Sequence, residues 1–304
     1  MVGLGRMGGN MAERLRAKGH EVVGFDAFSD ATEVATLEEL VQRLDPPRVV
    51  WVMVPAGDPT ESTIDRLRDL LEQGDVVVDG GNSNWRDSVR RAAALDAVGV
   101  GWVDAGTSGG IWGRTEGYCL MVGGDDTPVA LAQPVFDALA PAGGFVHTGG
   151  PGSGHFTKMV HNDIEYGLMQ AYAEGYELLA RSGLEIDAVG AMRAWREGSV
   201  VRSWLLDLFV RALEQHPDFD GIRGVAQDSG EGRWTVQEAI ERGIATPVIS
   251  AALYARFVSQ NDESVAMKAI AALREQFGGH AILPEVAAGE GPAPTAEPDE
   301  SATP

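Results

Sequence analysis

Gly3-Leu4-Gly5-Arg6-Met7-Gly8 is the stretch of sequence that decides the fold of the first half of the chain. Glycines at its first, third and sixth positions are typical of a tight turn between a strand and a helix, where the backbone can approach a diphosphate closely. A helical pattern follows from about Met7 to Lys18, and the N-terminus of a helix favours an anion. We therefore expect a dinucleotide to bind along this turn. The residues expected to contact it are Gly3, Gly5, Arg6, Met7 and Gly8.

An acidic residue follows the glycine turn at the distance that a dinucleotide site requires. Asp26 ends a predicted strand over residues 21–25, 18 positions after Gly8, where a carboxylate accepts hydrogen bonds from the adenosine ribose. A plain turn residue is the simpler interpretation of Asp26, as an incidental turn is of the glycines. A carboxylate here would repel a 2′-phosphate, and no Arg or Lys lies between residues 27 and 41. The sequence therefore predicts NAD as the cofactor, in preference to NADP.

Short valine-rich segments alternate with helical stretches through the first half of the chain. Strands are predicted at 21–25, 48–54, 75–79, 100–104 and 145–148, with helices between them that include 59–71 and 84–98. Such alternation predicts a parallel sheet with helices on both faces, and so an α/β Rossmann-type dinucleotide-binding domain over residues 1–150. Only Met1 and Val2 precede the glycine turn, where a strand of about five residues is usual. We therefore expect the true start codon a few residues upstream.

The second half of the chain changes character after Gly149-Gly150-Pro151-Gly152. Helices are predicted at 153–181, 187–197, 203–214, 235–242, 247–259 and 264–277, and no strand is predicted after Thr148. This pattern predicts an all-α C-terminal domain over residues 151–285. Residues 286–304 contain Ala, Pro, Gly and acidic residues without a basic one, so a disordered acidic tail is expected there.

The charge of the chain limits its partners. The formal net charge of the 304 residues is −21, so nucleic acid is not expected to bind, and an anionic substrate would need cations gathered locally. No apolar run of about 18 residues predicts a membrane span, and the glycines near the N-terminus do not resemble a signal peptide. Cys119 is the single cysteine, so no intrachain disulfide can form, which fits a cytoplasmic protein.

One face of the first helix of the second half carries an unusual set of side chains. Lys158, His161, Asn162, Glu165 and Tyr166 are spaced i, i+3, i+4, i+7 and i+8, which places them on the same side of a helix. They offer a candidate base, two hydrogen-bonding groups, an acid and a phenol. The alternatives are a solvated polar face and a metal site, since His161 and Glu165 are four residues apart. No third ligand has a recognisable spacing, so no metal is expected.

The stretch around these residues resembles a known signature. Gly154-His155-Phe156-Thr157-Lys158-Met159-Val160-His161-Asn162-Asp163-Ile164-Glu165-Tyr166-Gly167 is similar to that of the 6-phosphogluconate dehydrogenases. Residues 52–57, 79–83 and 107–110 match further motifs of the family in the expected order, and the resemblance extends from Gly3 to about His280. The length resembles the short form of the family, which often prefers NAD.

The resemblance implies a role for each matching residue. Lys158 would be the general base and Glu165 the general acid. Substrate contacts would come from Asn82, Ser108, Gly109, Gly110, His161 and Asn162, with Tyr166 and Arg256 on the phosphate. Further cofactor contacts would come from Val54, Pro55, Ala56 and Asn82. Arg274 and His280 would reach the substrate of a neighbouring subunit, which implies a homodimer or homotetramer.

The implied reaction is the oxidative decarboxylation of 6-phosphogluconate to ribulose 5-phosphate and carbon dioxide, with reduction of NAD, in the pentose phosphate pathway. One stretch departs from the pattern: Ser229-Gly230-Glu231-Gly232-Arg233-Trp234 stands where long forms have Lys-Gly-Thr-Gly-Lys-Trp. Ser229 thus replaces a phosphate-binding lysine, and Arg233 is the candidate to compensate. Two alternatives stay open, a 3-hydroxyacid dehydrogenase of the 3-hydroxyisobutyrate type and a non-catalytic NAD-binding sensor.

Overall fold

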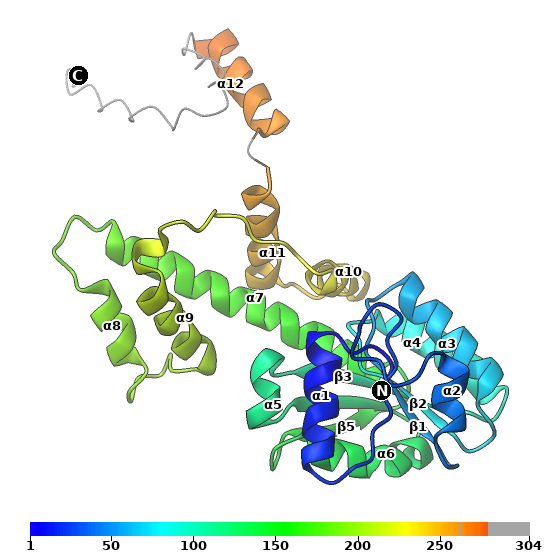
Figure 1. The fold of residues 1–304 in the computed structure, drawn as a ribbon. Helices are drawn as coiled ribbons and strands as arrows, with labels where there is room; N and C mark the ends of the chain where they lie inside the picture. The colour runs from blue at the N-terminus through cyan, green and yellow to red at the C-terminus, as the bar shows by residue number, and fades with distance from the viewer. Residues whose placement is uncertain (262, 279–304) are drawn as a thin grey trace, which may run out of the picture.

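A five-stranded mixed sheet forms the centre of the first half of the molecule (Figure 1). The computed structural model describes residues 1–261 and 263–278. The strands lie in the order of the sequence. They are β1 Val49–Val52, β2 Val76–Asp79, β3 Gly101–Ser108, β4 Cys119–Gly124 and β5 Phe145–Gly149. The Rossmann-like fold followed by a helical domain is therefore confirmed, whereas the expected division at residue 150 stays a prediction.

The sheet differs from the predicted one in two respects. β4 was not predicted, because its two terminal glycines weaken the strand pattern, and it pairs antiparallel with β3, so the sheet is not wholly parallel. The predicted strand at 21–25 was wrong as a strand, because it pairs with the sheet through single bridges. Val2 bridges Phe25 on one side and Val52 on the other, both in parallel. Too few residues on either side of Val2 continue the ladder.

Alternate residues of the buried strands face two different helical layers. Val76 and Val78 of β2 contact one core with α1 (Arg6–Ala17) and α6 (Asp126–Leu139). Val77 faces the opposite core. That second core is closed by α2 (Leu37–Gln42), α3 (Asp58–Leu70) and α4 (Trp85–Asp96). The period-two alternation of a strand therefore buries both faces of the sheet, as predicted. A 3-10 turn (Gly110–Trp112) and α5 (Gly113–Glu116) connect β3 to β4.

The second half is built around one long helix, α7 (Ser153–Ala180), which runs outward from the sheet (Figure 1). α8 (Ala188–Trp195) and α9 (Trp204–Gln215) pack on its far part, and α10 (Glu231–Arg242) and α11 (Pro247–Ser259) pack on its middle. A 3-10 turn lies at Pro217–Phe219, and α12 (Val265–Gly278) stands apart from the rest of the molecule. The described residues after β5 contain no strand. The predicted tail lies outside the described residues, and none of the described helices is both long and apolar enough to span a bilayer.

Strand β3 holds the start of α7 directly. The buried Asp104 carboxylate accepts hydrogen bonds from Gly152 N at 2.7 Å and from His155 N at 2.9 Å. It thereby caps a helix that has no cap from its own Gly152. A Cβ atom on Gly106 would lie 2.3 Å from the Cβ of Lys158. Only glycine at this position of β3 therefore allows α7 to lie so close to the sheet.

Candidate active site

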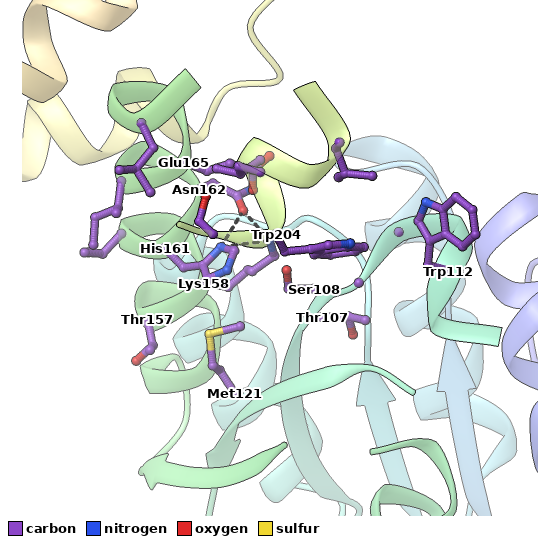
Figure 2. A pocket seen from close by; sticks show the side chains of 18 of the residues that line it. Thr107, Ser108, Trp112, Met121, Thr157, Lys158, His161, Asn162, Glu165 and Trp204 are labelled. Carbon is purple, nitrogen blue, oxygen red and sulfur yellow. Dashed lines mark hydrogen bonds between the residues drawn. The ribbon is translucent and has the colours of Figure 1, made fainter. Parts of the chain in front are cut away.

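A cavity of about 1040 Å³ lies between the sheet, α7 and the start of α9 (Figure 2). Ser108, Gly109 and Gly110 border it where β3 ends, and Trp204 of α9 borders it from the opposite side. The remaining residues with polar side chains in its wall are Thr107, Thr157, Lys158, His161, Asn162, Glu165 and Ser203, beside the indole of Trp112. The structure thus gathers seven residues predicted as substrate-contacting or catalytic, and the predicted cofactor residue Met7, around one space.

Lys158 is mostly buried in the wall of this cavity. Its Nζ donates a short hydrogen bond to Oδ1 of Asn162 and lies 3.4 Å from Nδ1 of His161 (Figure 2). Burial lowers the pKa of Lys158, and the carboxylates of Glu165 and Glu231 only partly oppose this. Burial, and then Lys158 itself, also lowers the pKa of His161. Both groups are therefore biased towards the neutral form that a proton acceptor needs.

Glu231 completes the arrangement, and the sequence did not assign it a role. It is the first residue of α10 and is 2% exposed. Its Oε1 accepts a hydrogen bond from Asn162 Nδ2 at 2.7 Å and a short one from Asn82 Nδ2. Asn82 follows β2, so this carboxylate joins the sheet half to α7. The signal available in the sequence was an acidic residue where the family motif has a threonine.

Glu165 lies on the same face of α7, one turn beyond Asn162, and lines the cavity (Figure 2). An acid and an amine therefore border a single space from one helix, as their spacing predicted. Trp204 and Ser203 also line this space, although no motif pointed to them. Their segment reaches the cavity only because α9 packs back along α7, which local sequence patterns do not reveal.

The residues predicted to bind phosphate are only partly brought together. The Arg256 guanidinium stacks over the Tyr166 ring, 3.4 Å from its centroid, and donates to Gln227 O at 2.7 Å. Ser229 N donates to the Tyr166 hydroxyl at 3.3 Å, so Ser229 does lie beside this pair. None of these residues lines the cavity. Arg233, the candidate replacement for the lysine, forms an ion pair with Asp228 at 2.9 Å instead.

The two residues predicted to reach the substrate of a neighbouring subunit do not line this chain's cavity within the described residues. Arg274 lies on α12, which stands apart from the cavity (Figure 1). His280 lies outside the described residues. Neither the reach of Arg274 to a second subunit nor the role of His280 is tested by this single chain, so both stay predictions.

The predicted cofactor residues meet at the carboxyl ends of the central strands, where dinucleotides bind in this type of sheet. Gly3 has φ +90, and a Cβ there would lie 2.3 Å from Met53 O, so the turn needs glycine. A Cβ on Gly5 would meet nothing within 4 Å, and no side chain accepts a hydrogen bond from Gly5's end of α1 as a cap. This cradle fits a diphosphate.

Asp26 closes the turn from the neighbouring loop. Its Oδ2 accepts from Leu4 N at 2.7 Å and its Oδ1 accepts from Phe28 N at 2.8 Å. Asp26 therefore shapes the turn. Each of its carboxylate oxygens keeps a lone pair, so the predicted hydrogen bonds from the ribose hydroxyls stay possible as well. Val54, Pro55 and Ala56 come one residue after the end of β1, and Arg6 begins α1 with an exposed side chain.

Comparison with known proteins agrees with the motifs. The NAD-binding domain of 6-phosphogluconate dehydrogenase matches residues 1–149, and the C-terminal domain of 6-phosphogluconate dehydrogenase matches residues 154–283. An NAD(+)-dependent, decarboxylating 6-phosphogluconate dehydrogenase of Haloferax volcanii is 42% identical over 293 residues, which cover 93% of this chain and 97% of that protein.

Two solved structures are similar over most of the chain. Plasmodium falciparum 6-phosphogluconate dehydrogenase, solved apo and in complex with its cofactor NADP+ or its substrate 6-phosphogluconate, is 26% identical with a TM-score of 0.75. The match covers 95% of this chain and 66% of that one. A Mycobacterium tuberculosis 3-hydroxyisobutyrate dehydrogenase has a TM-score of 0.69 at 24% identity, covering 90% and 97% of the two chains. That second likeness shows a shared fold alone.

Proposed function

Because the chain belongs to the 6-phosphogluconate dehydrogenase family, we propose that it oxidises and decarboxylates 6-phosphogluconate to ribulose 5-phosphate and carbon dioxide. The observation that carries this proposal is a buried Lys158 with a lowered pKa, facing the same cavity as Glu165. A sensor needs neither a base nor an acid. A 3-hydroxyacid dehydrogenase has no evident use for the acid, because its reaction ends at the oxidation.

The chain's own residues divide the reaction between them. NAD supplies the hydride acceptor when it is bound. Neutral Lys158 takes the proton of the C3 hydroxyl as the C3 hydrogen leaves with its electron pair. The resulting 3-keto acid loses its carboxylate as carbon dioxide, and protonated Lys158 donates a hydrogen bond to the enolate oxygen that forms. Glu165 then protonates C1 of this enediolate, which yields the ketone of ribulose 5-phosphate while Lys158 keeps the proton that it took.

The preference for NAD rests on Asp26, which holds a carboxylate beside the glycine turn. The curated relative from Haloferax volcanii is named NAD(+)-dependent, which supports the same preference. A 2′-phosphate would face this carboxylate and would find no cation in residues 27–41. NAD is therefore the proposed cofactor.

We also propose that the active unit is an oligomer in which α12 serves a neighbouring site, in a cytoplasmic protein. Large apolar side chains remain exposed on α11 and α12, which supports a covered surface in the assembly. These are Val248, Tyr254, Val258, Val265, Met267, Ile270 and Leu273. The single cysteine, Cys119, fits a reducing compartment.

Initial rates of NAD and NADP reduction with 6-phosphogluconate, with carbon dioxide trapped, test the proposal. We expect NAD reduction with one carbon dioxide per NADH, and a loss of about 10²-fold or more in Lys158→Met, which keeps the bulk of the side chain without its base. Efficient use of NADP would defeat the cofactor assignment alone. Turnover of 3-hydroxyisobutyrate in place of 6-phosphogluconate would defeat the function, and Lys158→Met with unchanged turnover would defeat the base.

A further inference from the structure

Glu231 stands out among the buried groups that the proposed reaction does not use. Glu231 does not line the cavity. Its Oε1 nevertheless accepts hydrogen bonds from the side-chain amides of both Asn82 and Asn162. Asn82 comes from the sheet half of the molecule and Asn162 from α7, next to Lys158. Its other oxygen, Oε2, is buried without a hydrogen-bond partner among the described residues.

The Glu231 carboxylate fixes the orientation of the Asn82 and Asn162 side-chain amides. A carboxylate only accepts hydrogen bonds, whereas an amide has one accepting end and one donating end. With both Nδ2 groups donating to Glu231, the oxygen of Asn162 must point towards Lys158, whose Nζ donates to it. A flipped Asn162 would instead offer its NH₂ to the lysine and occupy the lone pair that a proton acceptor needs.

We infer that Glu231 is a positioning residue for the proposed reaction, which holds the Asn162 amide in the one orientation that leaves the Lys158 lone pair free. This inference rests on the proposed function for its kinetic consequence, but its effect on Lys158 exists without turnover. The same contact fixes the oxygen of Asn82, which is left to accept a hydrogen bond from a hydroxyl group of substrate or cofactor.

Neighbouring contacts keep α10 in the register that this role requires. Further along α10, Glu238 accepts hydrogen bonds from Trp85 Nε1 at 3.0 Å and from Arg86 at 2.6 Å, both on α4. Glu231 is therefore not held in place by the two asparagines alone. The Glu238 contact joins the same two halves of the molecule without touching the cavity, so it supplies a matched control.

The charge of Glu231 also acts on Lys158 through space. The groups that face Lys158 are His161 and Glu165 on α7, Glu231 on α10 and Cys119 on β4. Glu231 favours the protonated lysine, so its neutral replacement lowers the pKa of Lys158 further. The acidic limb of kcat/KM, where Lys158 becomes protonated, therefore moves to lower pH in Glu231→Gln.

The test compares Glu231→Gln, Glu231→Met and Glu238→Gln in the full chain. Glutamine keeps an accepting oxygen without the charge, and methionine removes the acceptor. We expect Glu231→Gln to shift the acidic limb by roughly half a pH unit with kcat within about tenfold, and Glu231→Met to lose about 10- to 100-fold in kcat. Glu238→Gln lowers the unfolding temperature but leaves the limb in place.

A second measurement reads Lys158 without any catalysis. The pH dependence of its acetylation by acetic anhydride, followed by mass spectrometry of its peptide, gives the midpoint of its titration. A midpoint shifted to lower pH in Glu231→Gln and unmoved in Glu238→Gln supports the inference, even if 6-phosphogluconate proves not to be the substrate. An unmoved midpoint in Glu231→Gln, or unchanged kcat in a folded Glu231→Met, overturns it.

Discussion

Asp163 shows how a single buried charge can shape the stability of this molecule. Its side chain is fully buried, and neither carboxylate oxygen has a hydrogen-bond partner among the described residues. The nearby Thr235 hydroxyl donates to Met159 O and Glu231 O instead. Burial therefore raises the pKa of Asp163 to about 7, and the carboxylate of Glu231 adds to the effect.

A raised pKa in a carboxyl group means that the folded state holds a proton that the unfolded state has released. Between about pH 4 and pH 7, stability should fall as pH rises, by an amount on the order of 4 kcal/mol for this one group. We expect Asp163→Asn to be more stable than the native chain at pH 8, with little difference near pH 4. Urea unfolding at both pH values measures this.

Asp228 supplies a control of opposite sign. Its hydrogen bond from Arg233 holds the pKa of this carboxyl below its usual range, so Asp228→Asn should lose stability at pH 8 and lose less near pH 3. Equal effects of the two substitutions at pH 8 would contradict the assignment of a buried, protonated Asp163.

At the scale of elements, the position of α7 depends on two residues of the neighbouring strand β3. Asp104 caps the first turn of α7, and Gly106, which has no Cβ, leaves room for the Cβ of Lys158. A methyl group on Gly106 would collide with the Cβ of Lys158, on a helix that is fixed at its start. The whole of α7 would therefore have to move as a unit.

Gly106→Ala should destabilise the protein by about 1–3 kcal/mol through overpacking. It should also lower kcat by at least about tenfold, because Lys158 is displaced. Gly175→Ala on the same helix is the control, since a Cβ there meets nothing within 4 Å. It should gain up to about 1 kcal/mol from helix propensity. Unfolding curves and kcat of both variants decide, and a Gly106→Ala enzyme with native kcat would refute the displacement.

On the scale of the whole molecule, the cavity is poor in positive charge for its substrate. The chain has a formal net charge of −21, and the described lining residues offer only Lys158 and His161, both with lowered pKa values. Arg256 lies on Tyr166 outside the cavity wall. A phosphate and a carboxylate therefore need cations from elsewhere, which favours a contribution by Arg274 of a second chain.

Mixing two inactive variants tests this shared site. If Arg274 serves the neighbouring chain, Lys158→Met and Arg274→Ala combine in a mixed dimer to leave one site with both native residues. Unfolding and refolding them together at equal amounts should restore about a quarter of the native activity. Each variant refolded alone is the control. No recovery, with mixed dimers shown by native mass spectrometry, would place Arg274 outside the neighbouring site.

The sequence predicted the parts of the structure that depend on local pattern. The glycine turn follows from the spacing of its three glycines, and the face of α7 and the helical second half follow from the period of a helix. Glu231 could not be assigned, since its role depends on amides 149 and 69 residues away. Trp204 was missed for the same reason, because it reaches the cavity only through the packing of α9 along α7. β4 was missed because its terminal glycines weaken the strand pattern.

The cap that Asp104 provides has a consequence for recombination between relatives. The covalent junction near residue 150 looks like a natural point to join one protein's cofactor half to another's helical half. Yet the first turn of α7 is held by Asp104 and fitted to Gly106, both from before the junction. A chimaera joined there would take Lys158 from one parent, and would take Asp104 and Gly106, which position the helix that carries Lys158, from the other. Only parents that match at both positions should yield active hybrids.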